Sequence, residues 1–592
     1  MKRRVVGFVV VVAVGLVAAV AALAEEQAAE EVGVTLDWGV KIPMRDGVRL
    51  NATVYRPEGA GPLPVVFTLT PYISDSYHDR AWYFSRNGFV FVLVDARGRG
   101  SSQGTFRAFA QEAHDGHDIV EWLAGQPWSN GKVAMWGGSY AGYDQWATAK
   151  EFPPHLATIV PAASAQAGID FPFWRNISYP YVIQWLTFTG GVTGNLNLFI
   201  QEEFWNEKFW ELYRDHRPFL DLPEIAGNPA SEFSEWAAHP MQGPYWDAMN
   251  PSDAQLAELD LPILTITGHY DDDQPGAMEY YKRHMKLGSD EARAKHYLII
   301  GPWDHAGTRS PKAEFGGWKF GDASLLDLNE LHTQWYGWTM KGGERPEFLK
   351  DRVAYFVSGA NRWKYVHSLD AVASEQRRLF LHSTGEANDA FRSGLLVPQA
   401  PEAEGASDSY VYDPLDTRPG ELERRPRGDY ITNQTPALRL FGGGLVYHSE
   451  PFAEASEISG YLKLVVWLEL DVPDTDFAVA VYEILADGTS IRLSQDLMRA
   501  RYRDSLREAT PVPTGEIVRY VFDGFTWFSR QIAEGSRLRL VFKSPNSIFL
   551  QKNYNSGGVV AEESGNDART AHVRLYHDAG HPSFLELPVV RD

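Results

Sequence analysis

The chain has 592 residues, of which 44% are hydrophobic and 22% are charged. This balance is typical of a folded globular protein and excludes a disordered chain. One hydrophobic core stops growing at about 250–300 residues, so the length predicts two or three domains. The net charge of −22 argues against a nucleic-acid partner, which needs a basic surface. There is no cysteine, which excludes disulfides, thiolate catalysis and cysteine-bound zinc.

The first 24 residues have the pattern of a secretory signal peptide. Residues 2–4 are basic, an apolar run covers 5–20, and Ala-Leu-Ala at 22–24 is a small-x-small cleavage site. An uncleaved anchor is the alternative, but the run is slightly short for a spanning helix, which needs about 20 residues. We therefore expect 1–24 to be removed, giving a periplasmic or secreted protein with no stable membrane insertion.

Residues 33–165 and 256–345 alternate short apolar runs with helical patterns. The apolar runs are rich in β-branched or aromatic residues and end at Gly, Pro or Asp, as buried strands do. The expected strands cover 65–69, 89–94, 133–136, 263–267 and 297–300, and the expected helices cover 110–123 and 140–150. Because apolar strands separated by helices form parallel sheets covered on both faces, the two segments together predict an α/β domain.

Two other segments differ from this pattern. Residues 166–255 are rich in aromatic side chains and predict helices inserted over the C-terminal edge of the sheet, where open α/β folds bind ligands. We expect a helical cap there, with Trp174 as a candidate substrate-binding residue.

Residues 346–592, beginning with a strand at 353–357, carry many short strands separated by Gly, Asp, Asn and Pro. That spacing predicts an all-β sandwich.

Ser139 lies between an expected strand and an expected helix, in the glycine-flanked run GGSYAG at 137–142. A nucleophilic serine needs this context, because a sharp strand-to-helix turn strains its backbone and leaves no room for side chains nearby. The usual pattern is G-x-S-x-G, whereas here Ala141 stands at the last position and Gly142 follows it. Taken alone, a near match of this kind most often marks an ordinary turn.

The order of two further residues strengthens this interpretation. Asp271 follows the expected strand 263–267, and His305 follows the expected strand 297–300. α/β-Hydrolases carry the nucleophile, the acid and the histidine in this chain order. We therefore expect Ser139 to be the nucleophile and His305 its general base. Asp271 is expected to hold the imidazole tautomer and to stabilise the imidazolium.

The chain after the signal segment resembles a family of serine hydrolases that contains cocaine esterase, α-amino acid ester hydrolases, glutaryl acylases and X-prolyl dipeptidyl-peptidases. The matching motifs are GGSYAG at 137–142, Tyr-Asp at 270–271, Gly-Pro-Trp-x-His at 301–305, DARGRGSSQG at 95–104, QPWSNG at 126–131 and Tyr-Asp-Pro at 412–414. The resemblance implies an α/β-hydrolase core, a helical cap and a jelly-roll C-terminal domain. It also implies acyl transfer to water through an acyl-enzyme, with no cofactor and no metal.

The resemblance further implies an oxyanion hole with two donors. One donor is the backbone N–H of Tyr140, next to the nucleophile, and the other is the hydroxyl of Tyr72, after the strand 65–69. Such donors point to where negative charge develops on the tetrahedral intermediate. Position alone favours Tyr72 as a loop tyrosine packed on the sheet, and the resemblance reverses that interpretation.

The substrate stays open among small esters, amides and short peptides. In α-amino acid ester hydrolases a carboxylate cluster beside the catalytic aspartate binds the substrate ammonium. Asp273 matches one position of that cluster, Gln274 replaces a carboxylate at the next, and Asp170 is a candidate further member. The alternative function is therefore an X-Pro dipeptidyl-peptidase or an amino-ester hydrolase or acylase. Solvated acidic residues that cap a helix are the alternative for the carboxylates. Loop 551–558 is expected near the site.

Other interpretations remain for parts of the chain. His114, Asp115, His117 and Asp118 resemble a ligand set, but a zinc site needs a third ligand and a pocket, so surface and packing roles are favoured. The adjacent carboxylates 271–273 do not converge easily on one ion, which argues against a metal. Outside enzymes, the alternative is a secreted binding protein on a hydrolase fold, because jelly rolls also bind carbohydrate. A homo-oligomer stays open.

Overall fold

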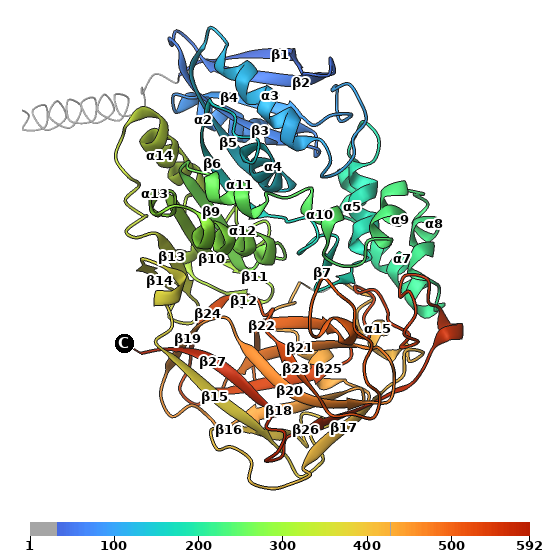
Figure 1. Cartoon of the computed structure of the whole chain (residues 1–592). Coiled ribbons are helices and arrows are strands. Elements are labelled where there is room, and N and C mark those ends of the chain that lie inside the picture. The colour runs from blue at the N-terminus through green and yellow to red at the C-terminus, as the bar shows by residue number, and fades with distance from the viewer. Residues whose placement is uncertain (1–31, 427, 592) are drawn as a thin grey trace, which may run out of the picture.

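The structure is a computed structural model, and it describes residues 32–426 and 428–591. The signal peptide predicted over 1–24 lies outside the described residues. An α/β domain and a β-rich domain follow one another along the chain, and the helices of the cap lie beside both (Figure 1). Among the described residues no helix is long and apolar enough to cross a membrane.

Ten strands form the sheet of the α/β domain, in the order β1-β2-β4-β3-β5-β6-β9-β10-β13-β14. The strands are β1 (Val34–Pro43), β2 (Arg49–Pro57), β3 (Leu63–Thr70), β4 (Val90–Asp95), β5 (Ser129–Ser139), β6 (Leu156–Ser164), β9 (Ile263–Tyr270), β10 (His296–Asp304), β13 (Val353–Val357) and β14 (Arg362–Val366). The run from β4 to β13 is parallel, and β1, β2 and β14 add antiparallel edges. The parallel strands carry their C-terminal ends to one edge of the sheet.

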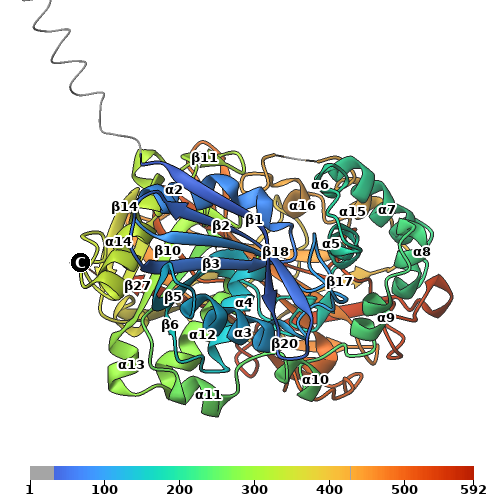
Figure 2. The ribbon, with the colours of Figure 1, turned by 90° about the horizontal axis from the view of Figure 1, so that it is seen from above.

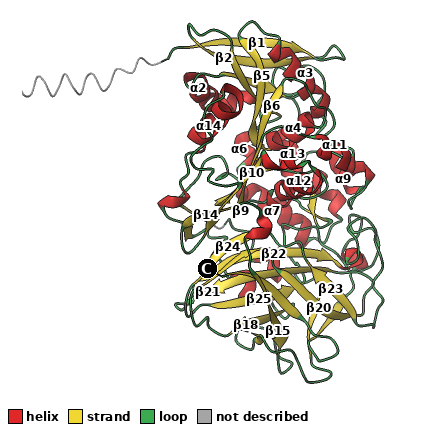
Figure 3. Cartoon of the chain, turned by 60° about the vertical axis from the view of Figure 1, so that its left-hand side comes forward, coloured by secondary structure: helices red, strands yellow, loops and turns green. Residues whose placement is uncertain are grey.

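Helices cover both faces of this sheet (Figure 3). On one face α2 (His78–Arg86) and α14 (Leu328–Lys341) pack against side chains such as Val66 and Leu93. On the other face α3 (Glu112–Ala124), α4 (Tyr140–Ala149) and α12 (Gln274–Leu287) pack against side chains such as Val65 and Phe67. Neighbouring residues of one strand thus enter two different cores, which explains why the strands are apolar without alternation.

Between β6 and β9 the chain forms the cap, which lies to one side of the sheet when seen from above (Figure 2). It contains the hairpin β7 (Phe173–Trp174) and β8 (Ile177–Ser178), and the helices α5 (Tyr181–Thr189), α6 (Leu196–Phe199), α7 (Glu202–Arg214), α8 (Leu222–Ala226), α9 (Ser231–Ala237) and α10 (Pro244–Asp247). Most of its buried aromatic side chains form one cluster that also includes Tyr140 and Tyr143 of α4. A further helix, α11 (Asp253–Glu258), leads back to the sheet.

The β-rich domain contains thirteen strands, nearly all of them antiparallel, around one large apolar core. They are β15 (Glu375–His382), β16 (Gly394–Val397), β17 (Ser407–Tyr412), β18 (Gly444–Ser449), β19 (Ser456–Gly460), β20 (Lys463–Leu470), β21 (Asp476–Ile484), β22 (Ser490–Arg499), β23 (Val518–Phe522), β24 (Phe528–Ile532), β25 (Arg537–Lys543), β26 (Ala571–Tyr576) and β27 (Phe584–Val590). The predicted fold class, an α/β core with an inserted cap followed by an all-β jelly-roll domain, is confirmed.

One predicted boundary differs from the structure. The strand expected at 353–357, which we placed in the domain 346–592, is β13, and it pairs in parallel with Leu298–Ile300 of β10. β14 then pairs with β13 at the outer edge of the same sheet. The sheet of the α/β domain therefore continues to Val366. A short strand that is buried on both faces fits either domain by its sequence, and only the pairing of its backbone decides between them.

A packing prediction follows from the approach of α3 to α4. A Cβ at Gly116 would lie 1.8 Å from Oγ1 of the buried Thr148. Alanine favours a helix over glycine by about 1 kcal/mol, yet we expect Gly116→Ala to lower the apparent Tm, because overpacking costs about 1–3 kcal/mol. Gly125→Ala, at the end of α3, is the control, since its Cβ meets nothing nearer than 3.6 Å. Equal Tm values in a thermal melt of the two variants would contradict the packing argument.

Candidate active site

Ser139 is the last residue of β5, and α4 begins at the next residue. Its backbone has φ 61° and ψ −127°, a conformation that residues other than glycine rarely adopt. Such strain persists only where the surrounding structure enforces it, and it is found at functional sites. The turn presents the serine side chain at the C-terminal edge of the sheet, as a nucleophile elbow does.

The small residues of this turn explain its departure from G-x-S-x-G. A Cβ at Gly137 would lie 2.6 Å from the Cβ of Ala141, so these two positions do not both accept a side chain. Because residue 137 is glycine, there is room for the methyl group of Ala141, and glycine is not required at position 141. A Cβ at Gly142 would lie 2.9 Å from the Cα of Ser164 on β6, so glycine there lets α4 approach the sheet.

Asp271 and His305 meet at the same edge, because β9 and β10, which precede them, pair in parallel. Nδ1 of His305 lies 2.9 Å from Oδ1 of Asp271. The buried carboxylate is held from both sides, since the Thr267 hydroxyl donates to Oδ2 at 2.8 Å and the backbone N–H of Asp273 donates to Oδ1 at 3.1 Å. Nδ1 of the imidazole is thereby committed to Asp271, and Nε2 is left for proton transfer.

The surroundings of His305 favour its charged form. Burial lowers the pKa of His305, but the charge of Asp273 and the hydrogen bond to Asp271 outweigh burial and raise it. Oδ2 of Asp273 lies 3.7 Å from Nδ1 of the imidazole. Arg309, on the loop that follows, acts in the opposite direction. Burial also raises the pKa of Asp273 well above its usual value, and the charge of His305 works against that rise.

Tyr72 faces the serine from the loop after β3. Its hydroxyl oxygen is 3.3 Å from Oγ of Ser139. Nε1 of Trp185, on α5 of the cap, donates a hydrogen bond of 3.1 Å to the same hydroxyl oxygen, and the ring of Phe188 stacks on the tyrosine ring. Burial raises the pKa of Tyr72, so the hydroxyl keeps its proton. It can therefore donate a hydrogen bond to an oxygen bound beside Ser139.

Arg99 ties the Tyr72 loop to the cap, a role that sequence reasoning missed. The guanidinium is buried, and its nitrogens donate to the backbone carbonyls of Pro71, Phe188, Gly190 and Gly191. The last three carbonyls lie at the C-terminal end of α5, where the helix dipole favours a cation. Burial lowers the pKa of Arg99 to about 10, which leaves it charged at neutral pH. Arg99 lies in the motif DARGRGSSQG at 95–104, which supported the family resemblance but did not by itself indicate this contact.

Tyr140 is the first residue of α4, so its backbone N–H has no acceptor within the helix. This places the N–H beside Ser139. The side chain is engaged in the protein interior, where its hydroxyl donates to Oε1 of Glu112 at 2.6 Å and accepts from the backbone N–H of Phe109 at 2.6 Å. Burial raises the pKa of Glu112 to about 7.

The two candidate carboxylates for substrate binding differ in their contacts. Asp273 lies beside His305, and its side chain is 16% exposed. Asp170 is buried, and its two oxygens accept hydrogen bonds from the backbone N–H groups of Gln166 at 2.8 Å and Gly276 at 2.6 Å. Asp170 therefore joins the start of the cap to the first turn of α12, and Asp273 is the member of the pair that reaches the site.

The other candidates lie where the cap meets the β-rich domain. Trp174 is buried in a small cluster with Ile177 and with Leu497 of β22. The backbone N–H of Gln551, at the start of the loop 551–558, donates to the carbonyl of Ser178 at 2.8 Å. Both contacts hold the β7–β8 hairpin against the β-rich domain.

The possible ligand set on α3 is used in ion pairs. Asp115 pairs with Arg97 at 2.6 Å, and Asp118 pairs with Arg45 at 2.7 Å. Within the described ranges no group of three or more histidine, aspartate or glutamate side chains is placed to hold a metal ion.

The β-rich domain contacts the segment that follows Asp271 through Gln274, the first residue of α12. The side-chain nitrogen of Gln274 donates to the carbonyls of Gly268 and Trp527, each at 2.8 Å, and its side-chain oxygen accepts from the backbone N–H of Trp527 at 2.6 Å. The Trp527 ring is buried in a core with side chains of α12, β10 and β13. The residue that replaces a carboxylate in the expected cluster thus joins the two domains.

Comparisons with known proteins agree with this architecture. A family model described as X-Pro dipeptidyl-peptidase (S15 family) matches residues 46–307, and one described as its C-terminal non-catalytic domain matches 347–586. The chain is 27% identical over 577 residues to cocaine esterase of Rhodococcus sp. (strain MB1 Bresler), covering 93% of this chain and 98% of that protein. The chain belongs to this family of serine hydrolases. The family resemblance found in the sequence motifs is confirmed.

Solved structures show that the fold of this serine hydrolase is shared over nearly its whole length. An aminopeptidase from the marine sediment archaeon Thaumarchaeota archaeon superposes with a TM-score of 0.80 at 21% identity, covering 95% of this chain and 97% of that one. An α-amino acid ester hydrolase superposes with a TM-score of 0.79 at 20% identity, covering 95% and 98%.

The charge of Asp273 gives a prediction for His305. Apart from burial, which lowers the pKa of His305, Asp273 has the largest effect and raises it. We therefore expect Asp273→Asn to lower this pKa, measured from the pH dependence of the imidazole Cε1–H NMR signal, with His305→Gln to assign it. Asp272→Asn is the control, because Asp272 is not among the main groups that shift the pKa of His305, so its loss is expected to move the signal less. An unchanged or higher pKa in Asp273→Asn would refute the argument.

Proposed function

We propose that this serine hydrolase is a secreted enzyme that cleaves the acyl bond of an ester or amide through an acyl-enzyme at Ser139. The observation that carries the proposal is the strained serine at the strand end with the Tyr72 hydroxyl 3.3 Å from its Oγ. The Asp271–His305 pair at the same edge of the sheet supports it. The family supplies the reaction class, and the geometry suggests which residue performs each step.

In the proposed mechanism, Oγ of Ser139 attacks the carbonyl carbon while Nε2 of His305 takes the hydroxyl proton. Asp271 keeps Nδ1–H oriented and stabilises the imidazolium. The oxyanion accepts hydrogen bonds from the Tyr72 hydroxyl and the Tyr140 N–H. His305 then gives its proton to the leaving alcohol or amine. Water, deprotonated by His305, then attacks the acyl carbonyl of the acyl-enzyme. The resulting tetrahedral intermediate collapses as His305 returns the proton to Oγ of Ser139, which releases the acid and restores the serine.

A second candidate substrate class, esters or peptides with a free α-amine, is favoured by one observation. Asp273 is a partly exposed carboxylate beside His305, and a substrate ammonium would pair with it. Gln274 does not add to such a site, because its amide is bonded to the backbone of Trp527. Comparing p-nitrophenyl esters with dipeptidyl anilides separates the two classes. If amine substrates are preferred, Asp273→Asn will raise KM for anilides and leave KM for neutral esters unchanged, measured at a pH above the pKa of His305 in both proteins.

The proposal includes export, which rests on the sequence pattern of residues 1–24. Cleavage after the Ala-Leu-Ala site would leave Glu25 as the first residue. N-terminal sequencing of the exported protein tests this, and a retained Met1 would contradict it.

Labelling with a fluorophosphonate tests the nucleophile. We expect one adduct per chain by intact mass, located at Ser139 by peptide mapping. Ser139→Ala should show no adduct and a loss of about 10⁶-fold in kcat, as for a serine hydrolase without its nucleophile. Ser164→Ala is the matched control, a buried serine that lies opposite Ser139 on the neighbouring strand, and it should still be labelled. Full activity in Ser139→Ala, or an adduct elsewhere, would refute the proposal.

The hydrogen bond from Trp185 to Tyr72 gives a prediction about positioning. With its oxygen accepting from the indole, the tyrosine hydroxyl has its own proton free to point at the oxyanion. Trp185→Phe keeps an aromatic ring but frees the hydroxyl to turn, and we expect kcat to fall about tenfold with little change in KM.

The control for this prediction is Trp205→Phe, which removes another buried indole N–H in the cap, one that donates to the carbonyl of Leu198. It should leave kcat within about twofold of wild type. Equal losses in the two variants would indicate general loosening of the cap and would contradict a positioning role for Trp185.

A further inference from the structure

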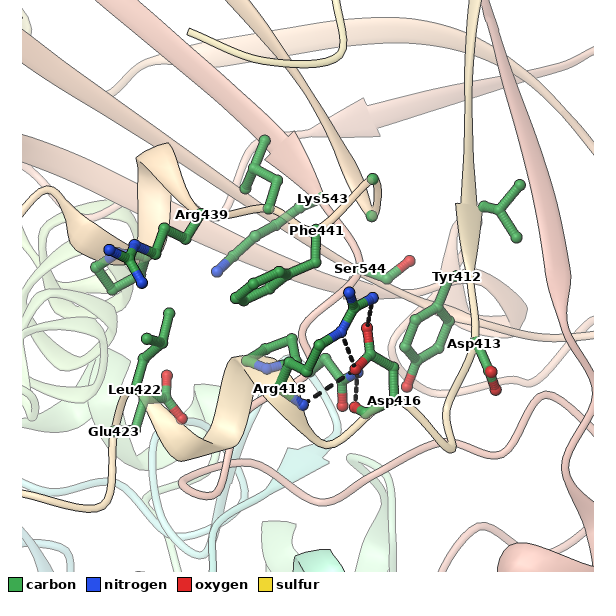
Figure 4. A pocket seen from close by; sticks show the side chains of 17 residues that line it. Tyr412, Asp413, Asp416, Arg418, Leu422, Glu423, Arg439, Phe441, Lys543 and Ser544 are labelled. Atoms are coloured by element: carbon green, nitrogen blue, oxygen red, sulfur yellow. Dashed lines mark hydrogen bonds and ion pairs between the residues drawn. The ribbon is translucent and has the colours of Figure 1, made fainter.

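A pocket of about 590 Å³ lies in the β-rich domain, and none of its lining residues belongs to the candidate active site. Its walls come from the end of β17, from α15 (Arg418–Glu421), from α16 (Thr435–Leu438) with the turn that follows, and from the end of β25 (Figure 4). The volume lies in the range of pockets that hold small molecules, which is about 300–1,000 Å³.

Three cations line this pocket, and they differ in their partners. Arg418 forms a bidentate ion pair with Asp416, at 2.9 and 2.7 Å, which balances its charge. Within the described part of the chain, neither the Lys543 ammonium nor the Arg439 guanidinium forms an ion pair. Figure 4 shows Lys543 extending past the Phe441 ring and the Arg439 guanidinium farther out, at the edge of the pocket. Two positive charges therefore face the pocket without a directly bound acid.

Glu423 is the acidic residue whose charge acts on Lys543, and one of its carboxylate oxygens already accepts two hydrogen bonds. Burial lowers the pKa of Lys543, and the charge of Glu423 opposes that effect. Oε2 of Glu423, however, accepts hydrogen bonds from the Ser547 hydroxyl at 2.8 Å and the backbone N–H of Ile548 at 2.9 Å. An anion bound in the pocket would supply the direct partner that a desolvated ammonium lacks.

Apolar side chains also line the pocket, among them Leu422, Pro436, Leu440 and Phe441, and the Arg418 guanidinium lies 4.8 Å from the centre of the Phe441 ring. Phe441 has φ 51°, a left-handed conformation that is uncommon for a residue other than glycine, and the residue is 38% exposed. The backbone is thus strained where it holds an aromatic ring at the pocket. Strain of this kind gathers at ligand-binding positions.

We propose that this pocket binds a small organic monoanion, a carboxylate on an apolar body, with the carboxylate between Lys543 and Arg439 and the body against Phe441. The charges of the lining residues favour one negative charge over two. Three acidic residues (Asp413, Asp416, Glu423) and three basic ones (Arg418, Arg439, Lys543) line the pocket, so its lining carries no net charge. A monoanion adds a single negative charge to this lining, whereas a dianion such as phosphate adds two and is held at a higher cost.

The pocket is also attached to the cap. The Tyr213 hydroxyl, on α7, lies 3.1 Å from the carbonyl of Asp416 and 2.5 Å from Oδ1 of Asn546, and both of these residues line the pocket. Arg424 pairs with Glu207 of α7 at 2.7 Å just beyond Glu423. The chain segment that forms one wall is therefore held in place from outside, and the pocket is formed before any ligand arrives.

Calorimetry on the full chain tests the proposal, with 4-phenylbutyrate as the probe and the uncharged 4-phenylbutyramide as its matched analogue. We expect the acid to bind wild type at least tenfold more tightly than the amide. In Lys543→Met/Arg439→Gln the Kd of the acid should rise tenfold or more, while that of the amide stays unchanged, because a charge-assisted pair is lost. All proteins compared in this test, including the one with the natural pocket, carry Ser139→Ala, so the amide is not hydrolysed and the outcome does not depend on the chemistry at Ser139.

The control is Lys286→Met/Arg345→Gln, which removes the same net charge from exposed positions of the α/β domain. It should bind the acid as wild type does. If the double pocket variant fails to fold, Arg439→Gln alone replaces it, since that side chain is exposed. Equal binding of acid and amide to wild type would overturn the proposal. So would acid binding that is unchanged in the pocket variant, which would place the probe elsewhere.

Discussion

The site depends on the parallel pairing of β5, β6, β9 and β10. Parallel strands deliver their C-terminal ends to one edge, so the loops that begin there meet even when their residues are far apart in the chain. The serine turn, the aspartate loop and the histidine loop all begin at that edge. Each of the three residues stands at the end of its strand or directly after it, so the strands themselves bring the residues together. A buried strand and a buried helix hold the strained backbone of the serine turn in place.

Contacts from the cap and the β-rich domain hold the loops that carry Tyr72 and Asp271. Tyr72 stands on a loop of the sheet, but Trp185 and Arg99 fix it through α5 of the cap. Asp271 stands on another loop, and α12 behind it is held by Trp527 through Gln274. Neither Tyr72 nor Asp271 is positioned by the α/β domain alone, so the geometry of the candidate site depends on all three parts of the chain.

The sequence revealed those features that have a local pattern. Ser139, Asp271 and His305 could be chosen because each follows a short apolar strand, and the strand ends of a parallel sheet have a known location. The contacts of Arg99 and Trp185 could not, because they join segments about ninety residues or more apart with no periodicity to mark them. The aromatic content of the cap suggested Trp174 for the site, but composition does not show which way a side chain points. In the structure the Trp174 ring packs against Leu497 of the β-rich domain.

The amide of Gln274 also bears on how far the domains are separable. It exchanges hydrogen bonds in both directions with the backbone of Trp527, in a buried place where water cannot substitute. Without the β-rich domain, the helix that follows Asp271 would expose an apolar face and an unpaired amide. The C-terminal half is therefore no detachable module. A chimaera that combines domains of two relatives would therefore need residues at positions 274 and 527 that come from the same parent protein.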